Sequence, residues 1–236
     1  YVITGSKLFI TNGFYASTYV VLAKTDLSKG NNGISAFIVE RSMEGVGIGK
    51  KENKLGMRAS DTVTMTFDAV RVPKGNLIGL EGGGFKQALT VLDGGRIGIA
   101  ALSVGLAQGA LDAAVKYAKE REAFGKPIAE FQGIQFKLAE MATEIQAARL
   151  LTYRAAMAKQ NGEPFNLIAA QAKLFASEVA QRVATEAVQV HGGYGFIKDF
   201  PVEKFYRDVM LLTIGEGTSE VQKMVIAKNL LQASSA

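Results

Sequence analysis

The sequence predicts an α+β protein in which part of an antiparallel β sandwich or barrel precedes an α-helical up-down bundle. Short apolar runs rich in β-branched residues occupy residues 1–80, and apolar residues recur at helical spacing beyond residue 81. A glycine-rich joint, EGGGF, lies where the two patterns meet. We therefore expect a β domain over residues 1–80 and a helical domain over residues 81–236.

Three short runs support the β domain. TYVVLAKT at 18–25 and GISAFIVE at 33–40 are apolar, and a turn-rich segment lies between them. TVTMTFDAVRV at 62–72 alternates between apolar and polar residues, which is the period of a strand with one buried face. Pro73 and Gly75 then end this run. Short strands at this spacing, with no helices between them, are typical of an antiparallel sandwich or barrel.

The first eleven residues, YVITGSKLFIT, contain two β-rich runs around Gly5 and Ser6, and this pattern predicts a β-hairpin. A protein seldom begins within a sheet. We therefore expect that further sequence precedes this segment.

The helical domain rests on two amphipathic stretches, which the helix-breaking sequence NGEP separates at 161–164. The first stretch repeats apolar residues at three- and four-residue spacing, and the second does so from Val179 onward. Pro201 suits the start of a further helix, and Ser219 with Gln222 forms a capping-box pattern that predicts another. The apolar positions are Ile134, Leu138, Met141, Ile145, Ala148 and Leu151 in the first stretch, and Leu174, Val179, Val183, Ala187 and Val190 in the second.

The segment IGIAALSVGLAQGALDAAV at 97–115 is apolar enough to resemble a membrane span. It nevertheless carries Gln108 and Asp112. We interpret it as a helix at the centre of a soluble bundle, in which Gly105 and Gly109 permit close helix packing.

Composition excludes several classes of site. The chain has 236 residues and no cysteine, which excludes disulfides and thiolate metal sites, and its single histidine excludes a His cluster. We therefore expect no metal centre. The net charge is +5, but the lysines and arginines are scattered, whereas nucleic-acid binding usually needs a dense basic face.

Glu216 stands between two glycines in the segment LTIGEGTSEVQ at 212–222. Flanking glycines let a backbone approach a ligand closely and aim a side chain into a cleft. A glutamate that its surroundings desolvate can act as a general base near neutral pH. The residues alone leave two interpretations open, a general base and a solvated loop residue.

The other glycine-rich segments carry weaker signals. HGGYGF at 191–196 follows a helix instead of opening one after a strand, so it fails the test for a dinucleotide-binding fold. EGGGF precedes a helix and is either a plain turn or a phosphate contact. Arg121 at a helix end either complements the helix dipole or binds a phosphate, and His191 is more often a packed or capping residue than a catalyst.

Nine segments in order resemble sequence blocks of the acyl-CoA dehydrogenase family. They are KLFITNG, GISAFIVE, KLGMRASDT, LDGGRIGIAA, REAFGKPI, FQGIQFKLAEMA, AVQVHGGYGF, PVEKFYRD and EGTSEVQ. The likeness runs along essentially the whole chain and is nearest to the bacterial short-chain, butyryl-CoA type. It implies that residues 1–80 are the C-terminal part of the middle β domain of the family. Residues 81–236 would then be its C-terminal four-helix-bundle-type domain.

The resemblance implies a FAD-dependent oxidoreductase of fatty-acid or amino-acid catabolism. In this family a glutamate at the position of Glu216 removes the α-proton of an acyl-CoA thioester, and a hydride passes to FAD, giving a trans-2-enoyl-CoA. Gly217 would present its N–H to the thioester oxygen. The resemblance further implies electron transfer to an electron-transferring flavoprotein and a homo-oligomer, expected to be a tetramer. The location would be the cytoplasm of a bacterium or the mitochondrial matrix of a eukaryote, with no membrane partner.

Two groups of binding residues carry over by position. The implied acyl-CoA contacts are Asp93, Gly94, Gly95, Arg96 and Gly217. The implied FAD contacts are Phe9, Ile10, Thr11, Arg121, Gln132, Gln189, Val190, His191, Gly192, Gly193, Thr218, Ser219 and Glu220.

The chain departs from the family pattern at two positions. Gly215 replaces the aromatic residue that usually precedes the base, which widens the acyl pocket or loosens the loop. Phe9 replaces the tryptophan of the flavin segment and lacks its indole N–H donor. Gly95 stands where some members place the base, so Glu216 has no rival there. Two alternative functions remain, a nucleic-acid-associated member of the fold and a non-catalytic fragment without the N-terminal helical domain.

Overall fold

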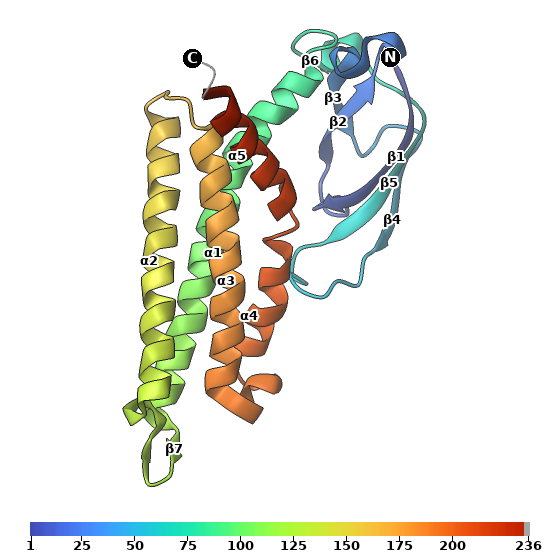
Figure 1. Ribbon diagram of the computed structural model, residues 1–236. Coiled ribbons are helices and arrows are strands. Elements are labelled where there is room, and N and C mark those ends of the chain that lie inside the picture. The colour runs from blue at the N-terminus through green and yellow to red at the C-terminus, as the bar shows by residue number, and fades with distance from the viewer. Residues whose placement is uncertain (234–236) are drawn as a thin grey trace. The chain divides into compact units, whose positions relative to one another are not determined.

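The computed structural model describes residues 1–233 and divides into two compact units, Tyr1–Val91 and Leu92–Ala236 (Figure 1). The first unit contains both three-stranded β-sheets, and the second contains most of the helices and a two-stranded hairpin. The α+β class predicted from the sequence is confirmed.

Six strands form two antiparallel sheets in the first unit. One sheet has the order β1-β5-β4, and the other has the order β2-β3-β6. Among the described residues no strand pairing closes these sheets into a barrel, so the barrel alternative of the prediction was wrong. The strands are β1 (Val2–Thr11), β2 (Thr18–Lys24), β3 (Ile34–Glu40), β4 (Val46–Lys51), β5 (Thr62–Arg71) and β6 (Leu77–Ile78), with 3-10 helices at Leu27–Gly33 and Lys74–Asn76.

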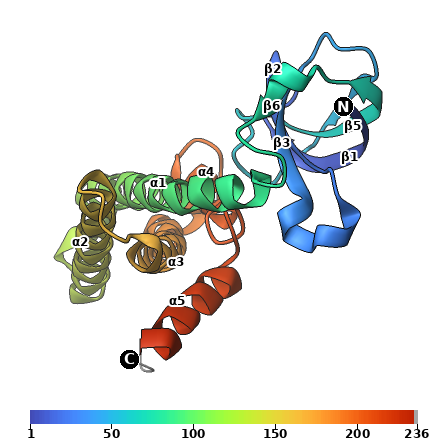
Figure 2. The same ribbon diagram turned by 90° about the horizontal axis from the view of Figure 1, so that it is seen from above.

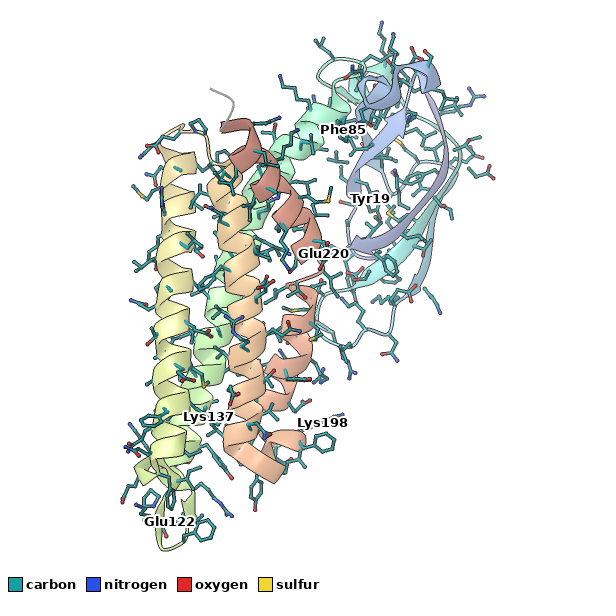
Figure 3. The ribbon with its side chains drawn as sticks, in the orientation of Figure 1. Tyr19, Phe85, Glu122, Lys137, Lys198 and Glu220 are labelled. Carbon is teal, nitrogen blue, oxygen red and sulfur yellow. The ribbon has the colours of Figure 1, made fainter. Side chains whose placement is uncertain are left out.

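The core of this unit lies between inward-facing side chains of both sheets. In β5 the predicted alternation is confirmed, because Val63, Met65 and Phe67 are buried while Thr66 is exposed. Tyr19 of β2, labelled in Figure 3, joins the core, and its hydroxyl donates to the carbonyl of Gly13 at 2.9 Å. The core residues are Ile3, Tyr19, Val21, Phe37, Val39, Val63, Met65, Phe67, Val70 and Val72.

The predicted hairpin at the start of the chain was wrong. β1 is one strand of ten residues that pairs with β5 from Val2↔Arg71 to Thr11↔Thr62. Gly5 has φ 150° at an irregularity in this pairing, so it accommodates a bulge and not a turn.

The second unit is an up-down arrangement of helices, as predicted. In Figure 1 the chain descends through α1 (Gly84–Glu120), ascends through α2 (Gln132–Gln160) and descends again through α3 (Asn166–His191). Figure 2 views α2 and α3 nearly end-on and side by side. The remaining elements are α4 (Val202–Asp208), α5 (Ser219–Ala233), the hairpin strands β7 (Glu122–Ala123) and β8 (Lys126–Pro127), and 3-10 helices at Ile128–Glu130, Gly192–Phe196 and Val209–Leu211.

Alanine dominates the buried helix faces, and its small side chain allows the helices to approach closely. In α2 the predicted seam is buried at Met141, Ile145 and Ala148. In α3 the predicted positions Val179, Val183, Ala187 and Val190 are buried together with seven alanines or serines between residues 169 and 184.

Helix α1 is, among the described residues, the one helix long and apolar enough to cross a membrane, and 39% of its most apolar stretch is buried within the protein. Its buried face includes Ala100, Ala107, Ala110 and Ala114. A Cβ at Gly109 would lie 3.3 Å from the ring of Phe205 in α4, so this glycine does permit a close approach. A Cβ at Gly105 would meet no atom within 4 Å, so close packing explains only one of the two glycines.

Candidate functional site

Glu216 lies in the turn between the buried Leu212 and the start of α5 at Ser219. Its backbone has φ 54°, and that of Gly217 has φ 88°. The left-handed region is unfavourable for a residue with a Cβ, so glutamate occurs here only if neighbouring contacts hold the turn. The glutamate side chain is exposed, whereas the sequence interpretation as a base had assumed desolvation by its neighbours.

The carboxylate of Glu216 faces Gly95 on helix α1. A Cβ built at Gly95 would lie 2.6 Å from Oε2 and 3.2 Å from Cδ of Glu216. The space that a side chain at position 95 would fill is therefore occupied by the Glu216 carboxylate. The family resemblance gave positions 95 and 216 as alternative places for the catalytic base. The structure brings these two positions together.

Two buried side chains bind the backbone carbonyls of the turn. Lys173 of α3 donates from Nζ to the carbonyl of Gly217 at 2.7 Å. Gln222 of α5 donates from Nε2 to the same carbonyl at 3.0 Å and to the carbonyl of Glu216 at 3.3 Å. Both donors are fully buried, and together they fix two successive peptide groups.

The bond from Gln222 to the Glu216 carbonyl also orients the N–H of Gly217, which belongs to the same peptide group. The peptide bond between Glu216 and Gly217 is trans, so the N–H of Gly217 is opposed to the Glu216 carbonyl across their shared peptide plane. Because that carbonyl faces Gln222, the N–H points away from Gln222. A substrate oxygen on that side would meet a fixed donor.

Lys173 is the most strongly perturbed group of this site. The pKa of its ammonium is lowered to about 8, chiefly by burial and then by the charge of Arg96, while Glu216, Glu220 and Glu178 act in the opposite direction. A positive charge is thus held inside the helical unit, next to the turn that carries Glu216.

Asp93 and Arg96 form an ion pair on α1, one turn apart. Arg96 Nη1 donates to Asp93 Oδ1 at 2.7 Å, and Asn166 Nδ2 donates to the same oxygen at 2.7 Å. Arg96 is buried, and its Nε has no hydrogen-bond partner within the described residues. A Cβ at Gly94 would lie 2.6 Å from Lys159 Nζ, so this face of α1 carries a cluster of polar groups around two glycines.

Helix α5 begins differently from the capping-box prediction. Thr218 is the N-cap, because its hydroxyl accepts from the N–H of Val221 at 3.3 Å. The Ser219 hydroxyl is buried without a partner within the described residues, and the Gln222 side chain binds the turn instead of the helix end. Hydrogen bonds from its own backbone N–H and from Thr218 lower the pKa of Glu220, which Figure 3 labels at the first turn of α5.

An open groove lies at this helix end and includes Thr218, Ser219 and Glu220, three of the predicted FAD contacts. Its opposite side is formed by Gln181 and Arg182 of α3. Glu178 and Glu220 also line this groove, so the buried, unpartnered Ser219 hydroxyl and the N-terminal end of α5 suit a polar ligand group.

A second groove, of about 540 Å³, brings Arg121 together with the segment Val190–Gly193. Arg121 lies 5.8 Å from the ring centre of Tyr194, and His191 stacks on Tyr117 at 4.3 Å. His191 is buried, its Nδ1 donates to the carbonyl of Ala187 at 2.8 Å, and burial lowers its pKa. His191 therefore shapes this groove as a neutral ring, in agreement with the packed role. Gln132 and Gln189 do not line the groove.

The remaining predicted FAD contacts, Phe9, Ile10 and Thr11, lie at the end of β1 in the first unit. Phe9 has φ 56° within an irregularity of the β1–β5 pairing, and the residue is 76% exposed. A bulge that turns an aromatic ring outward, at a cost in backbone energy, is a feature of binding sites.

Sequence reasoning did not single out Lys173, and it treated Gln222 only as a helix cap. A signal for Lys173 was present, because it is the one charged residue in AAQAKLFAS, where alanines mark a buried face. A lysine within such a face is rare unless its charge is paired.

Two family models match most of the chain. The family model described as acyl-CoA dehydrogenase, middle domain, matches residues 1–70, and the one described as acyl-CoA dehydrogenase, C-terminal domain, matches residues 82–231. The chain belongs to the acyl-CoA dehydrogenase family.

Individual relatives are similar throughout. A short-chain specific acyl-CoA dehydrogenase of Megasphaera elsdenii is 53% identical over 98% of this chain and 61% of its own length. The structure of butyryl-CoA dehydrogenase from the same organism has a TM-score of 0.96 at 53% identity, over 98% of this chain and 60% of that one. A chain from a study of the electron transferring flavoprotein of Acidaminococcus fermentans has a TM-score of 0.97 at 54% identity, over 98% and 61%. The chain thus spans about three fifths of the length of the relatives it matches.

Proposed function

We propose that the protein takes part in the FAD-dependent α,β-dehydrogenation of an acyl-CoA thioester to the trans-2-enoyl-CoA, with Glu216 as the base. The observation that carries the proposal is the Glu216 turn. It holds a carboxylate against a glycine of α1 and fixes the backbone donor of the next residue. Relatives named short-chain specific acyl-CoA dehydrogenase and butyryl-CoA dehydrogenase support the reaction class.

The residues of the turn have separate roles in this reaction. The Glu216 carboxylate takes the proton from the α-carbon, and the electron pair of that C–H bond becomes part of the new double bond. Negative charge then develops on the thioester oxygen. The fixed N–H of Gly217 donates to that oxygen, and a donor that needs no reorientation stabilises the developing charge.

Three sets of residues would contact FAD. Thr218, the unpartnered Ser219 hydroxyl and the first turn of α5 offer donors for one part of FAD, and Arg121 with the Val190–Gly193 groove offers a cationic and aromatic surface for another. Phe9 offers an exposed ring. FAD, when bound, supplies the acceptor for the hydride that leaves the β-carbon.

Partners and substrate range follow from the relatives. We infer a preference for short, unbranched acyl groups of four to six carbons, electron transfer to an electron-transferring flavoprotein, and a homotetramer in which the Arg121 groove serves a neighbouring subunit's cofactor. The first inference rests on the names of the short-chain relatives. The second rests on the similarity to the chain studied with the electron transferring flavoprotein of Acidaminococcus fermentans.

The test is Glu216→Gln in the full-length protein. The amide keeps the shape of the side chain but cannot accept the α-proton, so we expect turnover of butyryl-CoA to fall below detection while the flavin absorbance and the unfolding temperature stay unchanged. Glu140→Gln, at an exposed position of α2, is the control and should retain activity. Activity of Glu216→Gln within tenfold of wild type would show that another group is the base.

A further inference from the structure

Lys173 occupies a position where a lysine is unusual. It lies on the face of α3 that packs inside the helical unit, and its neighbours Ala169, Ala170, Ala172 and Ala176 are buried as well. The lysine itself has no exposed surface. Placing an ammonium there costs free energy, so its retention calls for a contact that a neutral apolar residue could not make.

That contact is the hydrogen bond from Nζ to the carbonyl of Gly217 at 2.7 Å. A charged donor binds a carbonyl more strongly than a neutral one does. Gln222 of α5 binds the same carbonyl, so side chains from two helices hold the turn. These two residues are 49 positions apart in the sequence. Neither side chain reaches the exposed side of the turn, where Glu216 lies.

We propose that Lys173 is a positioning residue for the Glu216–Gly217 turn, in that its buried ammonium holds the Gly217 carbonyl and so keeps the base and the adjacent N–H donor in one fixed arrangement. This inference rests on the proposed function of Glu216. It assigns to Lys173 no contact with substrate or cofactor.

The charges around Lys173 agree with a positioning role. The ammonium faces Arg96 from α1, Glu178 from its own helix, Glu220 from α5 and Glu216 from the turn. The hydrogen bond to an uncharged carbonyl leaves the Glu216 carboxylate unbound by the ammonium. Lys173 therefore orders the backbone under Glu216 without occupying the carboxylate.

The experiment compares Lys173→Met, which removes both donor and charge, with Lys173→Gln, which keeps a neutral donor, in the full-length protein. Lys228→Met, at an exposed position of α5, is the control. We expect kcat for butyryl-CoA to fall about 10- to 100-fold in Lys173→Met with KM changed less than threefold, because a displacement of about 1 Å in a reacting group costs about 100-fold. Lys173→Gln should recover part of this loss.

A second measurement follows the turn itself. Hydrogen–deuterium exchange should accelerate in peptides covering 212–222 in Lys173→Met and remain unchanged in peptides covering 141–158 of α2. A purely structural role for Lys173 would instead raise exchange throughout the helical unit and lower kcat only in proportion to the folded fraction. Unchanged kcat, or exchange that rises equally in both regions, would overturn the inference.

The two proposals fail in different ways. If Glu216→Gln is active, the base is assigned wrongly whatever Lys173 does. If Glu216→Gln is inactive while Lys173→Met retains both full kcat and slow exchange at 212–222, the base stands and the positioning role of Lys173 is wrong.

Discussion

Gly95→Ala should separate activity from stability. The added Cβ would lie 2.6 Å from Glu216 Oε2, and carbon atoms of this kind essentially never come within 3.0 Å of another heavy atom. The exposed end of the glutamate is the part free to yield, so the carboxylate must move by about 0.4 Å to reach 3.0 Å and about 0.8 Å to reach 3.4 Å, an ordinary contact. We expect the backbone of α1 to stay in place.

The expected loss of activity follows from that displacement. If about 1 Å costs about 100-fold, then 0.4 to 0.8 Å costs roughly 6- to 40-fold in kcat/KM. Stability should change in the opposite direction, because alanine is favoured over glycine inside a helix by up to about 1 kcal/mol. If the variant is less active but no less stable, displacement of the Glu216 carboxylate alone explains the loss of activity.

The assay is kcat/KM for butyryl-CoA with an artificial electron acceptor, together with thermal unfolding of the full-length protein. Gly105→Ala is the matched control, because its Cβ would lie on the same helix with no atom within 4 Å. It should gain similar stability and keep its activity. Activity of Gly95→Ala within threefold of wild type would refute the claim that the Glu216 carboxylate works from its position against Gly95.

Two further predictions concern pH and chain length. Burial is the main reason that the pKa of Lys173 falls from 10.5 to about 8 on folding. Between pH 8 and pH 10.5 the folded protein therefore binds fewer protons than the unfolded chain. The contribution of Lys173 to stability is thus lowest below pH 8 and rises toward pH 10.5. Over this range the free energy of unfolding of wild type, minus that of Lys173→Met, should therefore increase by at most about 3 kcal/mol. Urea titrations at several pH values measure this difference. A difference that does not change with pH would contradict the burial of a charged lysine. For the acyl chain, we expect kcat/KM to peak at four to six carbons, and an optimum at octanoyl-CoA would refute this. Each buried methylene contributes about 0.8 kcal/mol, roughly fourfold. A Cβ at Gly215 would meet Leu211 at 3.4 to 3.5 Å, an ordinary contact, so Gly215→Tyr should fold and should lower kcat/KM for octanoyl-CoA more than for butyryl-CoA.

The periodic elements could be predicted from sequence because burial dictates their spacing. The alternation of Val63, Met65 and Phe67, and the stripe through Ile145 and Ala148, each follow from one buried face. The hairpin at Gly5 could not be judged locally, since glycine suits a bulge and a turn equally. The pairing of β1 with β5, about sixty residues away, makes the segment one strand with a bulge. Nothing in the first eleven residues indicates that partner.

The turn that carries Glu216 was singled out from the sequence, and the contacts that hold this turn were not. Glu216 was recognisable by its two glycines, but its neighbour Gly95 is 121 positions earlier, and only the packing of α1 brings them together. The contacts of Lys173 and Gln222 are harder to foresee because both bind backbone carbonyls. Every residue has a carbonyl, so the sequence contains no complementary side chain that would reveal the pair.

The two glycines beside Glu216 suggest a flexible loop, yet the energetics favour a fixed one. A residue with a Cβ costs about 1 to 2 kcal/mol in the left-handed region that Glu216 occupies at φ 54°. A hydrogen bond from a charged donor contributes about 1.5 to 3 kcal/mol, and one from a neutral donor contributes about 1 kcal/mol. The hydrogen bonds from Lys173 and Gln222 to the turn are therefore of the same size as the cost of the strained backbone that they hold. Gly217, at φ 88°, adds little cost of its own, and a Cβ there would come within 2.8 Å of Gln222 Nε2. Glycine at 217 thus serves to admit the side chain that holds the turn.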